Sequence, residues 1–381
     1  NLEVDIEKFN LSMKQQKEQA RNAWVGSGEQ QIDKVWFKLS HKVVATEFLG
    51  YNSLRSQAKV LAIIKDGEIV EEIKGGCEAE IIFNQTPFFA ESGGQVSDKG
   101  LIKNEFFDAE IFDVKKVSDL IIHKIQIKNG GIKNGDLLNL EVDSDLRNSI
   151  SANHSATHLM HQALKEVIGT HVNQRGSLND VDRLRFDFSS NKAMSDLEIK
   201  QVEKIVNKHI LENTIIDTRL MDLDEAKKAG AQALFGEKYD NEVRVVMIGY
   251  NSLNINKSSS ARKRYSMELC GGTHVQRTGM IGSFIIKSEI ASSSGVRRIE
   301  AITGFNAIKY LQLNRSFINQ ITSTLKIPMG AVHERIVGLI NDKKSLSLKI
   351  NKLMNSAVGS NIPKEKLNNI KEINGISLIV N

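Results

Sequence analysis

The sequence has little of several residue types, and each scarcity excludes a class of protein. Among 381 residues there are two cysteines and three prolines, and aromatic residues make up 6%. Two cysteines cannot form the disulfide framework of a small secreted protein, so we expect a reducing compartment, the cytoplasm. No run approaches the ~18 apolar residues of a membrane span, and the first residues lack a signal-peptide pattern, so we expect no membrane partner.

Length and charge set the broad class. A chain of 381 residues with 40% hydrophobic residues is long enough for two or three domains with buried cores. The net charge of +5, from 51 basic and 46 acidic residues, indicates only a weak preference for anionic partners. The case for an anionic partner therefore depends on local clusters of basic residues. The alternative is that these clusters are basic loops that merely face solvent. The clusters are Arg262, Lys263 and Arg264, and Arg297 with Arg298.

The first 143 residues change from a helical to a strand pattern. Residues 5–24 place Phe9, Met13, Ala20 and Trp24 at helical spacing, which predicts an amphipathic helix. From about Phe37 the runs are short and alternate in polarity, which predicts a small antiparallel β-barrel. The expected strands are 58–64 and 68–73 around an Asp66-Gly67 turn, then 77–83, 106–114, 120–127 and 137–142.

From Asp145 onward helical and strand patterns alternate, which predicts an α+β domain with helices packed on a mixed or antiparallel sheet. The expected helices are 146–168 and 194–211, and the expected strands are 184–188, 215–221, 243–248, 283–289 and 296–303.

Beyond Gly304 the chain is predicted to be helical. Val332, Leu339, Leu346 and Leu353 recur every seven residues, a coiled-coil-like spacing. The seam fits either a helical hairpin within the chain or a homodimer contact through these C-terminal helices. Because the chain begins at Asn1 without methionine and stops after an apolar run at 376–380, we expect a fragment cut at both ends.

Two residue pairs have the spacing of metal ligands. His154 and His158 lie four apart in a predicted helix, so both imidazoles share one face. Cys270 and His274 flank two glycines and a threonine, and glycines allow the tight turn that would bring thiolate and imidazole together. Three nitrogens and one sulfur suit tetrahedral zinc, expected at one ion per chain. Ligand number does not distinguish a structural zinc from a catalytic one.

Two polar segments are candidates for binding a substrate. Residues 170–178 follow the predicted helix and contain Gln174, whose carboxamide could orient a water, although a surface turn is the alternative. Residues 86–95 end in Glu91-Ser-Gly-Gly-Gln95, and paired glycines let a ligand approach the backbone closely. A β-bulge or turn would explain the same glycines.

Together these segments resemble the editing half of alanyl-tRNA synthetase, a family that has free-standing relatives. The resemblance rests on Phe88-Phe-Ala-Glu-Ser-Gly-Gly-Gln95, His154-x-x-x-His158, His171-Val-Asn-Gln174, Cys270-Gly-Gly-Thr-His274 and Gly295 to Gly304. It implies five parts: the end of the tRNA-recognition helices (1–36), a β-barrel-like domain (37–143), a zinc-binding editing domain (144–304), a helical connector (305–360) and the start of a truncated C-terminal domain (361–381).

The resemblance also implies a function. An alanine-specific pocket excludes glycine and serine poorly, so a second site must hydrolyse seryl- or glycyl-tRNA(Ala). Its partner would be the acceptor end of tRNA(Ala), contacted by the basic clusters named above, while ATP and Mg²⁺ would serve alanine activation only in a part before Asn1. The alternatives are a noncatalytic, zinc-stapled tRNA-binding module and a free-standing deacylase. The catalytic or substrate-binding residues implied are Thr157, Gln174, Arg175, Glu91, Gly93, Gly94 and Gln95.

Overall fold

The structure is a computed structural model that describes residues 35–36, 39, 42–233, 240–250, 264–359, 370–373 and 376–379. It divides into two units, Asn1–Ile308 and Lys309–Asn381, which are described separately. The helix expected over residues 5–24 lies outside the described residues. The α+β class and the antiparallel barrel are confirmed.

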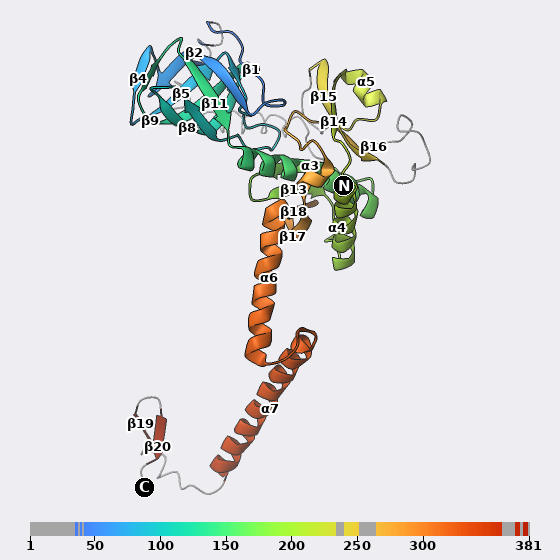
Figure 1. The fold of residues 1–381 in the computed structure, drawn as a ribbon. Coiled ribbons are helices and arrows are strands. Elements are labelled where there is room, and N and C mark those ends of the chain that lie inside the picture. Colours follow the sequence, from blue (N-terminus) through green and yellow to red (C-terminus); the bar gives the residue numbers. More distant parts are fainter. Residues whose placement is uncertain are drawn as a thin grey trace, which may run out of the picture. The chain divides into compact units, whose positions relative to one another are not determined.

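The barrel is built from six antiparallel strands, drawn in blue to teal in Figure 1. They follow one another in the order β11-β7-β8-β9-β5-β2, and β11 also pairs with β2, which closes the sheet. Short strands accompany them, namely β1 (Glu47–Phe48), β3 (Glu68–Val70), β4 (Glu72–Lys74), β6 (Gln85–Thr86) and β10 (Gly131–Lys133). The barrel strands are β2 (Arg55–Lys65), β5 (Glu78–Phe83), β7 (Gly100–Lys103), β8 (Asp108–Val117), β9 (Leu120–Asn129) and β11 (Leu137–Val142).

Alternating polarity and one turn explain the first hairpin of the barrel. In β2, Ala58 and Val60 are buried while Lys59 between them is exposed, because successive side chains point to opposite faces. Asp66 and Gly67 both have positive φ, at 53° and 79°, as a two-residue type I′ turn requires. The predicted hairpin is confirmed, with a second strand that ends at Val70.

Two sheets and two long helices form the remainder of the first unit. The four-stranded sheet has the order β12 (Gln174–Asn179), β13 (Leu184–Ser189), β18 (Val296–Thr303) and β17 (Phe284–Ser293). The three-stranded sheet has the order β14 (Asp217–Asp222), β15 (Glu242–Tyr250) and β16 (Arg264–Leu269). The helices are α3 (Ser144–Val167), α4 (Asp196–Leu211), the short α5 (Leu223–Lys228) and a 3₁₀ turn, η3 (Thr278–Ile281).

Helix α3 is the central element of this region. The side chain of Asp143 caps its N-terminus by accepting hydrogen bonds from the first-turn amides. Ala156, Leu159 and Ala163, spaced three and four residues apart, are fully buried in the core that α3 shares with the four-stranded sheet. The polar residues on its other side are buried too, so α3 lies between the sheet and other parts of the protein.

Several strands were not predicted, among them β7 of the barrel, some short strands, and two strands of the α+β region. Residues 174–179, expected as a polar stretch or surface turn, form β12 and pair with β13. Arg264, expected on a basic loop, begins β16. In both cases hydrogen bonds to a neighbouring strand stabilise a segment whose own pattern is weakly β, since strand formation depends on context.

The second unit contains helix α7 (Val332–Gly359), most of helix α6 (Gly304–Leu325), a 3₁₀ turn, η4 (Met329–Ala331), and a hairpin of β19 (Ile370–Ile373) and β20 (Ile376–Ile379). The seven-residue seam lies on α7, where Leu339 is 40% and Leu353 is 69% exposed. Homodimerisation through this seam stays a prediction. Among the helices that the structure describes, none has both the length and the apolar character needed to span a bilayer.

Candidate metal centre and its cavity

The structure brings the two predicted ligand pairs together. His154 and His158 come from α3, and Cys270 and His274 come from the loop that follows β16. The four possible ligand atoms all lie within 4.8 Å of one another. Cys270 Sγ is 3.4 Å from His154 Nε2 and 3.3 Å from His274 Nε2. Three imidazole nitrogens and one sulfur around one point are the donor set of a tetrahedral zinc site.

The loop that carries Cys270 and His274 needs a glycine at position 272. A Cβ atom there would lie 2.1 Å from His154 Cε1, so any side chain would displace that imidazole. The loop is also held from outside, because Arg244 Nη1 donates hydrogen bonds to the carbonyls of Cys270 (3.1 Å) and Gly272 (2.6 Å). Tyr51, from the barrel side, donates to the carbonyl of Gly271 at 2.5 Å.

Each of the three imidazoles has a partner on its Nδ1 atom. His154 Nδ1 lies 2.8 Å from Gln95 Oε1, His158 Nδ1 lies 2.7 Å from Glu268 Oε2, and His274 Nδ1 lies 3.2 Å from Ser155 Oγ. Partners on Nδ1 leave Nε2 as the metal-binding atom in each ring. His158 Nε2 is buried and has no hydrogen-bond partner among the described residues. A buried, unpaired nitrogen beside a sulfur fits a bound cation.

Electrostatics favour the anionic form of the sulfur. Burial raises the pKa of the Cys270 thiol, but the neighbouring imidazoles, above all His154 and His274, lower it well below its usual range. Burial lowers the pKa of His274 to about 3, so this ring is neutral. A thiolate and a neutral imidazole are the forms that bind a metal.

Glu268 is the buried anion behind the centre. Burial raises the pKa of its carboxyl, but His158 and His161 lower it well below its usual range. His161 Nδ1 lies 3.0 Å from the other carboxylate oxygen, Glu268 Oε1. Burial lowers the pKa of His158, while Glu268 and Cys270 raise it to about 10 overall, so a metal ion that binds this ring has to displace a proton from Nε2. A carboxylate bonded to a metal-binding histidine orients the ring and makes it a stronger ligand.

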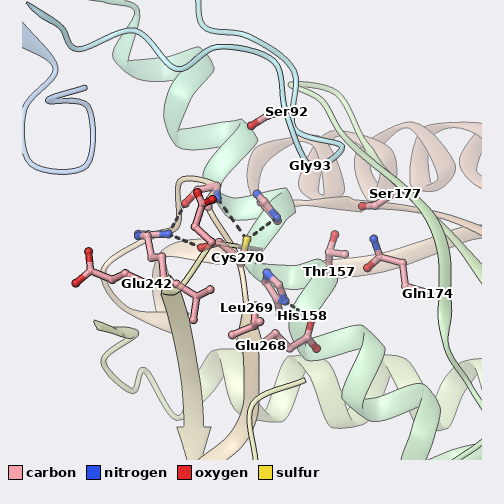
Figure 2. Close-up of a pocket in the computed structure, with 16 residues that line it drawn as sticks. Ser92, Gly93, Thr157, His158, Gln174, Ser177, Glu242, Glu268, Leu269 and Cys270 are labelled. Atoms are coloured by element: carbon pink, nitrogen blue, oxygen red, sulfur yellow. Dashed lines mark hydrogen bonds and ion pairs between the residues drawn. The ribbon is translucent and has the colours of Figure 1, made fainter. Parts of the chain in front are cut away.

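A cavity of about 250 Å³ opens beside this centre. Figure 2 shows Thr157, Gln174 and Ser177 on one side of Cys270, and Glu242 on the other. Ser92 and Gly93 come from the barrel side of the chain and contribute to the wall. The cavity therefore joins the metal-ligand cluster to a set of hydroxyl and amide groups.

The other residues predicted for substrate binding lie elsewhere. Gly94 packs against Ser177, and Gln95 is fully buried and bonds His154 rather than lining the cavity. Glu91 is exposed on the barrel side. Arg175 is exposed and lines a different cavity, of about 690 Å³, at the far end of α3. The structure thus brings Thr157, Gln174 and Gly93 to the cavity but not Glu91 or Arg175.

None of the described basic candidates lines this cavity. Arg297 donates two hydrogen bonds to Glu289, and Arg298 donates two to Asp187. Arg264 lies six positions before Cys270 on an extended strand, so about 20 Å separates them. It lines a separate cavity of about 920 Å³ with three other cations, Lys165, Arg219 and Lys228. Arg262 and Lys263 lie outside the described residues.

Sequence reasoning missed four contributors: Glu268, Arg244, Ser155 and Tyr51. A signal for Glu268 was present, because it lies two residues before Cys270 and residues two apart on a strand face the same side. Ser155 lies between the two helical histidines, but nothing local indicates that it contacts His274. Arg244 is on β15, 26 residues from Cys270, and only the pairing of β15 with β16 brings it close.

Comparisons with known proteins identify relatives of this chain. The family model described as tRNA synthetases class II (A) matches residues 1–146. The model of the threonyl and alanyl tRNA synthetase second additional domain matches residues 243–300, which include Cys270 and His274. The alanine–tRNA ligase of Paracoccus denitrificans is 46% identical over 376 residues, covering 99% of this chain and 42% of that protein. This chain is related to the alanine–tRNA ligases.

Two further alanine–tRNA ligases support the relationship. The protein of Dinoroseobacter shibae is 47% identical over 350 residues, which cover 92% of this chain and 39% of the relative. The protein of Chelativorans sp. is 42% identical over 378 residues, which cover 99% of this chain and 42% of the relative. The chain thus spans about two fifths of the length of these alanine–tRNA ligases. The resemblance to the alanyl-tRNA synthetase family is confirmed, and the match over 243–300 gives the chain an editing-type second additional domain.

Proposed function

We propose that the His/Cys centre binds one zinc ion and that the adjoining cavity hydrolyses serine or glycine wrongly esterified to tRNA(Ala). The observation that carries this proposal is the convergence of His154, His158, Cys270 and His274 beside a cavity with polar walls. The similarity of residues 243–300 to the second additional domain supports it. The acceptor end of tRNA(Ala) would be the partner.

The chain's own residues would bind and orient the substrate. From one wall of the cavity, the Gln174 carboxamide can hold a water or donate a hydrogen bond to the ester carbonyl. When bound, zinc would polarise or position the aminoacyl ester. Serine carries a hydroxyl that the polar walls can pair with, whereas alanine would leave those groups unpaired, and that difference favours removal of serine.

We further propose that the whole protein attaches alanine to tRNA(Ala), as the names of its relatives indicate. In the same proposal, ATP and Mg²⁺ serve this reaction in a part of the protein other than the present chain. In this proposal the present chain supplies proofreading rather than ligation. A free-standing deacylase would share the same chemistry and differ only in the segments that accompany it.

Hydrolysis of three aminoacyl-tRNAs tests the proposal. Seryl-tRNA(Ala) should lose its amino acid much faster than alanyl-tRNA(Ala), by more than the ~10–200-fold that size alone allows, with glycyl-tRNA(Ala) between them. Equal rates on the three substrates would refute selection by the hydroxyl. A noncatalytic module with a structural zinc would bind the tRNA, retain its metal and leave all three esters intact.

The two cysteines provide a matched pair of variants. Cys270→Ala should lose zinc and deacylation together, because three remaining ligands hold the ion weakly. Cys77→Ala removes the other thiol, which lies in the barrel and contacts the Lys74 carbonyl, and should change neither property. Zinc content is measured after dialysis against a weak chelator. Deacylation that persists in metal-free Cys270→Ala would contradict a zinc-dependent reaction.

A further inference from the structure

Gln95 reaches the metal centre from the barrel side of the chain and is fully buried there. Its Oε1 atom lies 2.8 Å from His154 Nδ1 and 2.9 Å from the backbone nitrogen of Thr273. Its Nε2 atom donates to Thr273 Oγ1 at 2.8 Å. One amide side chain therefore contacts a helical ligand and the loop that carries the other ligand pair.

These contacts determine which nitrogen of His154 carries the proton. A backbone N–H only donates, so the Gln95 atom facing Thr273 N must be the acceptor, Oε1. His154 Nδ1 then has to donate to the same oxygen, which leaves its Nε2 atom unprotonated. That nitrogen points at Cys270 Sγ, 3.4 Å away, where the metal would lie.

The backbone around Gln95 is held against the same region. Gln95 N donates to the Ser92 carbonyl, which closes a tight turn. Asn179 N donates to the Gly94 carbonyl at 2.6 Å, and Val96 N donates to the Asn179 carbonyl at 3.1 Å, so the turn is docked on β12. The turn that presents Gly93 to the cavity is thus the turn that orients His154.

We propose that Gln95 is a positioning residue that couples the barrel side of the chain to the metal centre by fixing the tautomer and orientation of His154. This inference rests on the proposed zinc site, not on the proposed hydrolysis. It follows that the metal is bound tightly only while the turn at residues 92–95 is docked on β12, and that a bound metal in turn stabilises the docked turn.

Zinc affinity, measured by chelator competition on the full chain, tests the inference. Gln95→Leu should weaken zinc binding by about 10- to 100-fold, the range found when the partner of a metal-binding histidine is removed. Gln85→Leu is the matched control, because the Gln85 side chain, among the described residues, bonds only the Gln57 carbonyl, far from the metal centre in the sequence, and the affinity of this variant should equal that of the parent. Circular dichroism and thermal melting establish that both variants are folded.

Two more variants separate positioning from a merely structural role. Gln95→Glu keeps an acceptor for His154 Nδ1 and should restore most of the affinity. Thr273→Val removes the Nε2 contact and the 2.9 Å contact with Ser151 Oγ but keeps both Oε1 contacts, and its affinity should resemble that of the parent. With Co²⁺ in place of zinc, the visible absorption bands report ligand geometry, and they should shift in Gln95→Leu but not in Thr273→Val. If Gln95→Leu does not fold, the Gln95→Glu and Thr273→Val results decide the question.

Each remaining outcome has a definite meaning. If folded Gln95→Leu has the zinc affinity and the Co²⁺ spectrum of the parent, the inference is overturned. It is also overturned if Gln95→Leu and Thr273→Val lose the same amount of zinc affinity. A parent chain that binds no zinc would overturn the inference and the zinc centre together. Loss of affinity in Gln95→Leu from a parent that never hydrolyses seryl-tRNA(Ala) would leave the inference intact and refute the proposed function.

Discussion

Gly93 and Gly94 are neighbours in one turn, but a side chain would meet different surroundings at each. Both have positive φ, at 58° and 80°. A Cβ atom on Gly94 would lie 2.5 Å from the carbonyl oxygen of Ser177, whereas one on Gly93 would meet no atom within 4 Å. Gly93 also lines the cavity. At the residue scale, Gly93 is therefore a position for changing selectivity, and Gly94 is a position on which docking of the turn depends.

We expect Gly93→Ala and Gly94→Ala to separate selectivity from stability. Both place alanine at positive φ, which costs about 1 kcal/mol. In Gly94→Ala the new Cβ atom would also clash with the Ser177 carbonyl oxygen, which should lower the melting temperature and the zinc content. Gly93→Ala should keep its zinc and change the ratio of seryl- to alanyl-tRNA(Ala) hydrolysis. Zinc loss in Gly93→Ala with a normal Gly94→Ala would contradict this assignment.

His123 should make the barrel sensitive to acid. It is fully buried, with Nε2 2.8 Å from Thr86 Oγ1. Burial lowers its pKa to about 4, despite the Ile81 carbonyl bond that raises it. The unfolded chain, with a histidine pKa of about 6.5, binds this proton first as the pH falls. Stability is therefore lost between about pH 6.5 and pH 4, by roughly 3 kcal/mol in total.

Urea unfolding at pH 7 and pH 4.5 measures this loss. The nontitrating variant His123→Gln is the control, because carboxylates elsewhere also respond to acid. The parent should lose more stability over this interval than the variant does. The same pH dependence in both proteins would exclude His123 as the cause.

At the scale of elements, α3 connects the barrel to the metal centre. Its first turns carry Arg147, whose guanidinium bonds Asp98 in the barrel domain and the carbonyls of Gly50 and Pro87. The Arg147 and Asp98 side chains are only 5% and 1% exposed. Two turns further on, the same helix presents His154 and His158. The buried ion pair and the metal ligands therefore share one rigid support.

We expect Arg147→Met to be strongly destabilising, by about 3–5 kcal/mol, because it leaves the Asp98 carboxylate buried without its partner. Arg55→Met removes a surface pair with Glu141, in which the arginine side chain is 77% exposed, and should have little effect. Chemical denaturation of both variants measures the difference. Similar stabilities for the two variants would show that the buried pair is not needed to hold α3 against the barrel.

At the scale of the whole molecule, a net charge of +5 is too small to predict a nucleic-acid surface. Within the first unit, however, four cations line one cavity of about 920 Å³ between α3 and the three-stranded sheet: Lys165, Arg219, Lys228 and Arg264. Arg219 and Arg297 each donate two hydrogen bonds to a carboxylate, Asp217 and Glu289, but the Arg219 side chain is 63% exposed and that of Arg297 only 16%. The basic groups thus differ in how accessible they are to RNA phosphates.

We predict that tRNA binding weakens with salt and that this cavity contributes to the dependence. Each phosphate contact adds about 0.9 to the slope of log K against log salt. Replacing Arg219 and Lys228 with glutamine should therefore reduce the slope by about 2, while Arg297→Gln should leave it unchanged. Filter binding over a series of salt concentrations measures the slopes. A larger effect from Arg297→Gln would place the RNA on the other sheet.

Most elements could be predicted from the sequence because their patterns are local. Five of the six barrel strands follow from local patterns such as the alternating polarity of β2, whereas the four-residue β7 was missed; α3 follows from apolar residues three and four positions apart. Strand β12 was missed because Gln174-Arg-Gly-Ser lacks such a pattern and is held by its partner β13. The seam on α7 was found, but its partner is not determined by spacing alone.

The four candidate ligands follow from sequence spacing alone, because four residues on a helix or around a glycine pair bring each pair together. The residues that surround these ligands are brought there by long-range packing. Gln95 is 59 residues from His154 in the sequence, and Glu268 is 110 residues from His158. No local periodicity relates residues so far apart, and they meet because the barrel turn docks on β12 and strand β16 packs beside α3.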